Sequence, residues 1–478
     1  MADAVSFVRQ SMLHCSTYHE ALQCTREGGS FMPTRVISID PNDPPLRLVE
    51  SATKATSYAT LSYCWGGTVP PSTTRANISD MFQQITEDGL PVMFRQAIQL
   101  AQSLKIPYIW IDSLCIAQDW PEDWEAESER MCLYYENASL NIAPASSDNP
   151  YVPFIKEIDK IWWPISLEIR DLQDKVSHIT VRRVPRLDTQ NNDLGTLFGR
   201  AWTFQESVFA RQTDTAFESP STIGEFSSWQ FLVHEYSSRR LTFATDKLPA
   251  ISGAAAKFYD RVKCRYLAGL WADNLPQALI WRCFGALSEL RPSPREYVAP
   301  SWSWASVTRT VSYPLWGGYT RPMLFYSGVK VLDFDCDVPG RNPYGKVCGG
   351  FMLLSGKTVL VKIKVDGHHH SMVSRKDWDF YPDFALQQSG ESIFRSMLEK
   401  SPSPFEANVH CLYLATAKES GHVGIPSSRT LFTHYALVLG RSGPEEEASF
   451  CRLGLMQSTS DNAMRLFDAA TEKTVRII

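Results

Sequence analysis

Several signatures that would assign the chain to a broad class are missing from its sequence. It has no run of about 18 apolar residues, so we expect no membrane-spanning helix. Its first residues, Met1–Val5, lack a basic stretch followed by an apolar one, so we expect no secretory signal. Lys and Arg (47) nearly balance Asp and Glu (52), and the net charge of −5 gives no basic footprint for nucleic acid.

Dense cysteine spacing is also missing. The eleven Cys are scattered along the chain, which indicates reduced thiols and a cytoplasmic protein. Cys15, His19 and Cys24 lie close together in sequence, but the spacing of Cys15 and His19 is that of one helix face packing on a local core. We therefore predict no metal site.

The composition that remains is that of a globular protein. Hydrophobic residues make up 44% of the 478 residues, and fourteen of them are Trp, which favours large aromatic-rich cores. A chain of this length commonly folds as about three domains.

One stretch, Tyr108–Asp112, organises the first part of the chain. Its apolar residues predict a strand buried on both faces, and open parallel sheets hold their functional groups just beyond such strand ends. A similar strand over Tyr58–Tyr63 precedes it, and a third follows over Leu140–Ala145. Helical patterns starting at Leu90 and Asp119 separate the three. This alternation predicts an α/β domain, a parallel sheet with flanking helices and right-handed crossovers.

The rest of the sequence shows three different patterns after the α/β segment. Residues 146–198 interrupt the α/β pattern as an insertion with one strand near His178–Arg183, and residues 240–290 are predicted to be helical. From about residue 326 alternating segments predict strands. We therefore expect four parts: a helical and strand lead-in (1–45), an α/β domain (46–218), a helical region (219–325) and a β-rich domain (326–478).

Several ordered motifs resemble one known family, the fungal heterokaryon-incompatibility (HET) domain. These motifs are YATLSYCWG (58–66), YIWIDSLCIAQD (108–119) and RAWTFQE (200–206). Further segments resemble full-length members of the family: Cys15, His19 and Cys24 followed by Leu46–Glu50, then Arg240–Thr242, Asp246–Leu248, Ala268–Trp271 and PSWSWAS (300–306). The likeness covers nearly the whole chain.

The resemblance implies a role in allorecognition, in which incompatible fungal cells die after fusion. It implies self-association or an incompatibility partner protein. The HET domain is similar to the Toll/interleukin-1 receptor fold, some members of which cleave NAD, so NAD is a candidate substrate. In that fold the catalytic Glu follows a Trp on the helix after a central strand, and Glu127 follows Trp124 in the corresponding place. An enzyme of specialised metabolism on the same scaffold is a further alternative.

Three carboxylates are candidate catalytic groups, each with a structural alternative. Asp112 could act as an acid or base, or stabilise the turn that follows its strand. Glu127 could stabilise a ribosyl oxocarbenium ion, or belong to an exposed acidic helix face. Glu206 could bind a ligand together with Arg200 and Trp202, or form an ion pair that fixes a helix end.

Candidate ligand-binding residues follow the two predicted strands: Cys64, Trp65, Gly66, Gly67 and Ser113. Paired glycines allow a sharp turn or a close approach to a ligand, although neither GxGxxG nor GxxxxGK[ST] is present. Cys64 and Cys115 both lie at predicted strand ends and are also candidate nucleophiles. Convergence of the three carboxylates beside Cys64–Gly67 would favour a small-molecule or nucleotide enzyme, whereas their separation would favour an interaction module.

Overall fold

The computed structural model divides the chain into two compact units, Met1–Asp214 and Thr215–Ile478. The structure describes all residues except the following ranges: 19–30, 52–55, 146, 157–164, 171–175, 182–195, 210–224, 286–292, 295, 315–322, 367–368, 374–376, 390–391, 396–403, 420–431 and 443–448.

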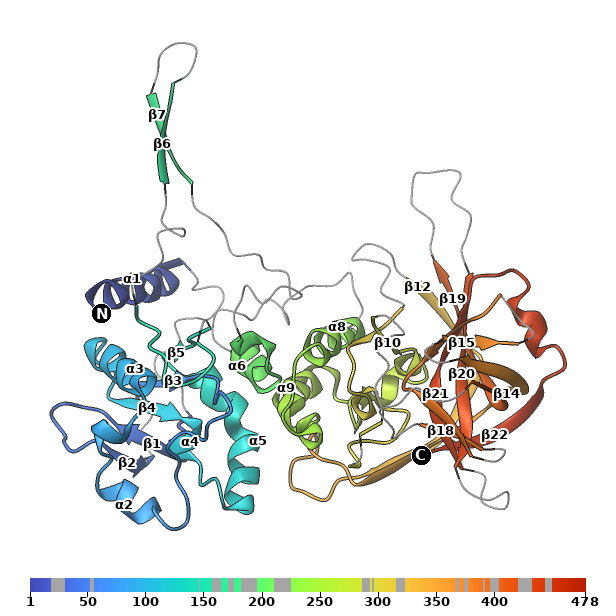
Figure 1. Ribbon diagram of the computed structural model, residues 1–478, viewed down its shortest axis with the longest axis horizontal. Coiled ribbons are helices and arrows are strands. Elements are labelled where there is room, and N and C mark those ends of the chain that lie inside the picture. The colour runs from blue at the N-terminus through green and yellow to red at the C-terminus, as the bar shows by residue number, and fades with distance from the viewer. Residues whose placement is uncertain are drawn as a thin grey trace. The chain divides into compact units, whose positions relative to one another are not determined.

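The first unit is built on a five-stranded sheet with strand order β2-β1-β4-β3-β5 (Figure 1). The predicted parallel arrangement of β3 (Tyr58–Leu61), β4 (Tyr108–Ile111) and β5 (Leu140–Ile142) is confirmed. The sheet as a whole is mixed, because β1 (Arg35–Ser38) pairs antiparallel with both β4 and β2 (Arg47–Glu50). A short connection joins β1 to β2, and short connections permit only antiparallel pairing.

Helices α3 (Val92–Ser103) and α5 (Pro121–Asn137) form the two crossovers. The chain moves from β3 to its neighbour β4 in one direction, and from β4 past β3 to β5 in the other. Right-handed connections in opposite directions place their helices on opposite faces of the sheet. Trp110 of β4 faces α5, with ring centroids 5.4 Å from Tyr134 and 5.7 Å from Tyr135.

The described part of this unit contains four further α-helices. The elements are α1 (Ala2–Tyr18), α2 (Ile78–Gln83), α4 (Asp112–Cys115) and α6 (Trp202–Phe209). His19 and Cys24 lie outside the described residues. The insertion contains a two-stranded hairpin, β6 (Ile165–Arg170) and β7 (Val176–Val181), of which only the second strand was predicted.

The second unit begins with helices α8 (Glu225–Ser237) and α9 (Ser252–Val262). The prediction of helix over 240–290 is wrong beyond α9, because β8 (Tyr266–Leu267) and β9 (Leu270–Trp271) form a hairpin. Its turn is fixed by Gly269, at φ +99°, whose carbonyl accepts hydrogen bonds from Trp229 Nε1 (2.9 Å) and Trp304 Nε1 (2.8 Å). None of the helices in the described ranges is long and apolar enough to cross a membrane.

The rest of this unit is β-rich, as predicted. Seven strands form the main path of a nine-stranded sheet, in the order β12-β19-β20-β21-β22-β14-β13. Their bounds are β12 Met323–Ser327, β13 Val329–Asp337, β14 Gly349–Asp366, β19 Phe405–Glu419, β20 Phe432–Ser442, β21 Ser449–Ser458 and β22 Thr471–Ile477. The two remaining strands of this sheet are β15 (His369–Met372), which pairs with β14, and β16 (Asp379–Pro382), which pairs with β21. Two separate two-stranded sheets are formed by β10 (Arg282–Cys283) with β11 (Val311–Ser312) and by β17 (Leu386–Ser389) with β18 (Ser392–Arg395).

A buried ion pair ties this sheet to the segment before it. Arg452 of β21 and Asp383 are both 0% exposed, and Arg452 Nε lies 2.9 Å from Asp383 Oδ2. The same guanidinium donates to the carbonyl of Leu279 (2.7 Å) and stacks on the ring of Trp281, 3.4 Å from its centroid. The guanidinium of Arg452 therefore donates its hydrogen bonds to groups outside its own strand. These bonds offset the cost of burying its charge.

Candidate functional site

The carboxyl ends of β3 and β4 form one edge of the sheet in the first unit. The two strands are parallel and in register, with Leu61 opposite Ile111, so Ser62–Trp65 and Asp112–Ser113 emerge side by side. The helices that follow the two strands lie on opposite faces. In open α/β sheets this change of face opens a crevice at the strand ends, where ligands bind.

Asp112 stands at this edge and is held by two donors. Its Oδ1 accepts a hydrogen bond from the backbone N–H of Ser113 (2.7 Å), and its Oδ2 accepts one from Trp65 Nε1 (3.1 Å). The side chain is half-buried, and desolvation raises the pKa of its carboxyl, while these hydrogen bonds and the positive charge of Arg200 act in the opposite direction. The predicted turn-stabilising contact is therefore present together with a contact to a second candidate, Trp65.

The side chain of Glu206, on α6, is buried beneath the same edge of the sheet. It is 8% exposed and accepts a hydrogen bond from the hydroxyl of Ser62. Buried Tyr135 of α5 links the two carboxylates: its pKa is raised well above the usual range by burial and then by the negative charges of Glu206 and Asp112. Asp112 and Glu206 therefore belong to one electrostatic group.

Arg200 and Tyr63 complete this group, which we call the strand-end cluster (Ser62, Tyr63, Trp65, Asp112, Ser113, Tyr135, Arg200 and Glu206). Arg200 Nη1 donates to the carbonyl of Tyr63 (2.8 Å), and the Tyr63 hydroxyl donates to Ser113 Oγ (2.9 Å). Burial raises the pKa of Tyr63 well above its usual range. The cluster thus connects β3, β4, α5 and α6 through side chains that are mostly buried.

Trp202 and Cys64 lie beside the cluster and have structural contacts of their own. The ring of Trp202 packs edge-on against Trp124 of α5, with centroids 5.9 Å apart. The Cys64 thiol is buried and lies 3.8 Å from the hydroxyl of Thr196. Burial raises the pKa of the other strand-end thiol, Cys115, to about 12, which leaves it protonated and unreactive at neutral pH.

The paired glycines have different roles. Gly66 adopts φ +70°, and a Cβ there would lie 2.2 Å from Asn149 Cβ, so the backbone packs against another part of the chain. Gly67 adopts φ +76° and has nothing within 4 Å of the corresponding position. Both residues make a sharp turn, and the close approach that Gly66 permits is to Asn149.

Glu127 belongs to a different buried group. It is 2% exposed, and the Tyr134 hydroxyl donates to its Oε2 (3.0 Å). The prediction of an exposed acidic helix face is wrong at this position, because Thr34 and Arg35 lie beside it. Arg35 donates to the Cys115 carbonyl (2.8 Å) and forms an ion pair with Asp123. Desolvation raises the pKa of Glu127, while hydrogen bonds from Thr34 and Tyr134 oppose the shift.

The geometry therefore divides the three predicted carboxylates. Asp112 and Glu206 share the strand-end cluster with Trp65, Ser113 and Arg200, whereas Glu127 has separate partners. Of the cluster, only half-buried groups such as Asp112 and Trp65 reach the surface, and a carboxyl with a raised pKa in that position could donate or accept a proton. Among the described residues no group of three His, Cys, Asp or Glu side chains is arranged to hold a metal ion.

Residue patterns missed several members of these groups. The sequence patterns predict only that Tyr63 and Arg35 lie in strands and that Tyr135 lies in a helix. An Arg in an otherwise apolar strand is the one signal that could have indicated a buried ion pair, since charged side chains are seldom buried without a partner.

Comparison with known proteins bears on the same part of the chain. Residues 58–206 match the family described as Heterokaryon incompatibility protein (HET). No curated protein and no solved structure gave a match. The matched range starts at the first residue of β3 and ends at Glu206, so it includes every member of the strand-end cluster. Residues 58–206 therefore form a heterokaryon-incompatibility (HET) domain.

Proposed function

We propose that this chain is a heterokaryon-incompatibility factor that triggers the death of incompatible fungal cells, and that its HET domain acts by self-association in the cytoplasm. The family match supports the incompatibility role. The observation that carries the mode of action is the exposed apolar face of the β6–β7 hairpin, which lies within the matched range.

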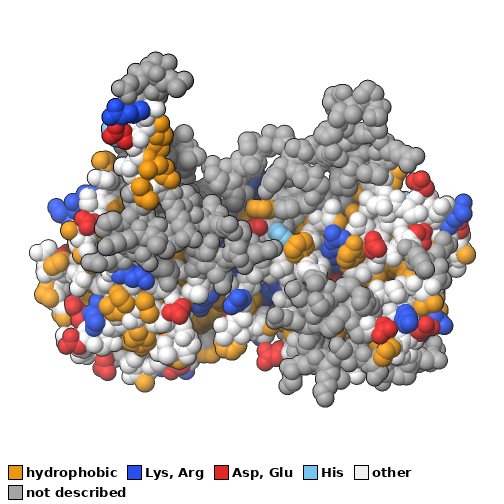
Figure 2. All heavy atoms as spheres, turned by 45° about the horizontal axis from the view of Figure 1, so that its top comes forward, with side chains coloured by type: hydrophobic (Ala, Val, Ile, Leu, Met, Phe, Trp, Pro, Cys, Tyr) orange, Lys and Arg blue, Asp and Glu red, His pale blue; other side chains and the backbone are white. Residues whose placement is uncertain are grey.

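The hairpin is amphipathic by alternation. Two directly opposed pairs, Ile165–Val181 and Leu167–Ile179, share one face, and these side chains are 64%, 49%, 46% and 45% exposed. The pairs Ser166–Thr180 and Glu168–His178 share the other face. Figure 2 shows the apolar side chains of the hairpin gathered along one side, with charged side chains beside them.

A second copy of the same hairpin is the occupant that fits this face. An isolated two-stranded ribbon is marginally stable in water, and contiguous exposed apolar side chains mark interaction sites. Two identical apolar faces can bury each other around a two-fold axis, because such an interface is self-complementary. Association would thereby stabilise the hairpin and cover its apolar side chains in one step.

The state of the carboxylates supports association over chemistry as the primary activity. Glu127, which the resemblance alone would place as the catalytic Glu of an NAD-cleaving domain, is 2% exposed and accepts a hydrogen bond from Tyr134. Glu206 is engaged by Ser62 beneath the surface. A substrate would have to displace packed chain segments to reach either group.

Expression in a filamentous fungus tests this function. We expect the wild-type chain to reduce the number of viable cells and the Leu167→Glu variant to lose that effect, because a charge on the apolar face opposes its burial. Thr180→Glu, on the polar face of the same hairpin, is the matched control and should kill as the wild type does. Killing that is equal in all three, or absent in the wild type, would contradict the proposal.

The second candidate function is that of an enzyme on a Toll/interleukin-1 receptor-like scaffold. The observation that favours it is Asp112, half-buried with a raised pKa beside Trp65 at the strand-end edge. Its substrate would be NAD, a related nucleotide or a small molecule of specialised metabolism. Incubation of the purified chain with NAD, followed by mass spectrometry, tests it: nicotinamide release that is lost in Asp112→Asn would establish the enzyme, and no release would support association.

A further inference from the structure

A cavity of about 720 Å³ lies in the second unit, outside the HET domain. Three segments that the HET motifs leave unexplained contribute to its wall: Arg240–Thr242, Lys247 of the Asp246–Leu248 segment, and Ala305 of the Trp-rich segment 300–306. The segment Val307–Thr310 closes another side. Segments separated by up to about 70 residues thus meet around one space, which is the usual construction of a binding site.

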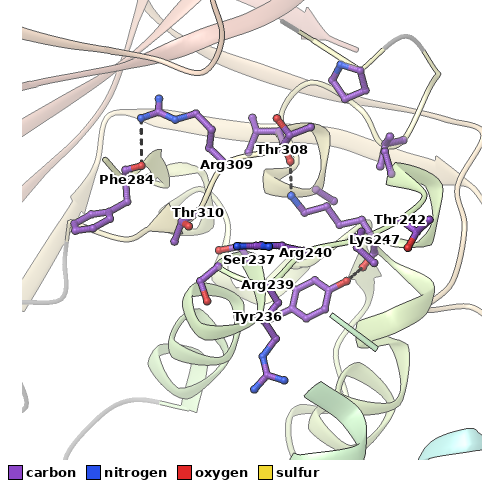
Figure 3. A pocket seen from close by; sticks show the side chains of 17 residues that line it. Tyr236, Ser237, Arg239, Arg240, Thr242, Lys247, Phe284, Thr308, Arg309 and Thr310 are labelled. Atoms are coloured by element: carbon purple, nitrogen blue, oxygen red, sulfur yellow. Dashed lines mark hydrogen bonds between the residues drawn. The ribbon is translucent and has the colours of Figure 1, made fainter. Parts of the chain in front are cut away.

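The charge of this cavity is positive. Arg239, Arg240, Lys247 and Arg309 line it, and no Asp or Glu is among its described lining residues. Figure 3 shows Arg240 between Lys247 and Thr310, with Arg309 directed to the carbonyl of Phe284.

Lys247 is a buried cation with no carboxylate partner among the described residues. Its side chain is 7% exposed, its ammonium donates to the carbonyl of Val307, and it lies 5.5 Å from the ring centroid of Trp304. Burial lowers the pKa of Lys247 to about 8, and among the described residues the Cys283 thiol opposes this shift. A buried ammonium without a carboxylate is costly, and a bound anion would offset that cost.

Arg240 differs from Lys247 in standing exposed at the edge of the cavity. Within the described ranges its guanidinium has no hydrogen-bond or ion-pair partner, so its donors are available to an incoming ligand. Thr242, Thr308 and Thr310 add hydroxyl groups to the wall. Guanidinium and hydroxyl donors around one space suit the oxygens of phosphate and carboxylate groups.

We propose that this cavity binds an organic anion of about mononucleotide size. Its phosphate or carboxylate group would accept hydrogen bonds from Arg240 and be attracted by the charge of Lys247. The volume falls within the range of small-molecule pockets, about 300–1,000 Å³. Tyr236 and Phe284 provide aromatic surface for the uncharged part of the ligand. The proposal does not depend on how the HET domain acts.

Calorimetric titration of the full chain tests the site with three probes. Adenosine monophosphate and citrate carry the two anionic groups, and adenosine is the uncharged control. We expect at least one anion to bind and adenosine not to bind. Binding of adenosine monophosphate alone identifies a phosphate site, and binding of citrate alone identifies a carboxylate site.

Two variants locate the binding. Arg240→Gln should lower the affinity for the anion by about ten- to a hundredfold, the usual effect of losing hydrogen bonds to a charged group. Thr242→Val replaces one hydroxyl of the same wall with a methyl group of similar size and should weaken anion binding less. Arg465→Gln changes an exposed Arg elsewhere in this unit and should bind as the wild type does. No binding of either anion, binding of adenosine equal to that of its phosphate, or unchanged affinity in Arg240→Gln would overturn the proposal.

Discussion

Three buried charged side chains in the described part of this protein have partners distant in sequence. Arg452 pairs with Asp383, Glu206 accepts from Ser62, and Arg35 reaches Asp123 of a later helix. Partners at such separations are brought together only by the tertiary fold. This is why sequence patterns could propose Asp112 and Glu206 as important residues but could not indicate what they touch.

Replacing Arg452 tests the fully buried pair that it forms with Asp383. Arg452→Met should lower the free energy of unfolding of the second unit by about 3–5 kcal/mol, because it leaves the Asp383 carboxylate buried with a weaker partner. Denaturant unfolding followed by circular dichroism measures the change. Arg465→Met, at an exposed position, should alter it little; equal effects of the two substitutions would contradict the described role of the pair.

Lys247 predicts a pH dependence of stability. Its pKa is about 8 in the folded chain and close to 10.5 when unfolded, so between these values the unfolded chain binds the proton that the folded chain has lost. The free energy of unfolding should therefore rise with pH across this window, by up to about 3 kcal/mol from this residue.

Comparison with Lys247→Met isolates that contribution from the titration of tyrosines and other lysines. Urea unfolding at pH 7.5 to 10.5, in steps, should give a wild-type curve that rises relative to the variant. Parallel curves would show that the ammonium is not desolvated, and would remove one support of the anion site.

At the scale of elements, apolar runs and helical periodicity predicted the order β3-α3-β4-α5-β5 and its parallel pairing, which the structure confirms. They failed where a short apolar run is compatible with either helix or strand. Tyr266–Trp271 forms a hairpin because Ala268 and Gly269 adopt positive φ, at 44° and 99°, which a helix does not allow. They also missed the antiparallel pairing of β1 with β4, and the contacts of Thr34 and Arg35 with Glu127 and Asp123 of α5.

The turn after β3 allows a matched test of its two glycines. Gly67→Ala should cost about 1–2 kcal/mol, the strain of a left-handed backbone for a residue with a Cβ. Gly66→Ala should cost more, because its new Cβ would also overlap Asn149. Thermal unfolding of the two variants measures the difference. A smaller loss for Gly66→Ala than for Gly67→Ala would contradict the packing of this turn.

At the scale of the molecule, the chain carries two separable features in its two units. The first unit contains the HET domain with its strand-end cluster and its exposed hairpin. The second unit contains the cationic cavity and the buried Arg452–Asp383 pair. The predicted division at residues 45, 218 and 325 stays a prediction, because composition marks changes of character and not the limits of packing.

The cluster also explains why the HET motifs lie far apart in sequence. The segments 58–66, 108–119 and 200–206 each contribute side chains to one edge of the sheet, where Ser62 meets Glu206 and Trp65 meets Asp112. The loss of one contributor should therefore loosen the other two. Asp112→Asn keeps the shape of the side chain and one of its two acceptor oxygens, so it can still accept from Trp65 but loses the hydrogen bond from the Ser113 N–H. The enzymatic test of this variant is therefore read together with its circular dichroism, which must match that of the wild type.

The proposed association is tested most directly by the mass of the purified full chain in solution, measured by light scattering over a wide concentration range. The account predicts a monomer–dimer equilibrium for the wild type and for Thr180→Glu. It predicts a monomer for Leu167→Glu at the same concentrations, because a carboxylate on the apolar face cannot be buried without a partner. A wild-type chain that stays monomeric throughout, or a Leu167→Glu variant that dimerises equally well, would contradict it.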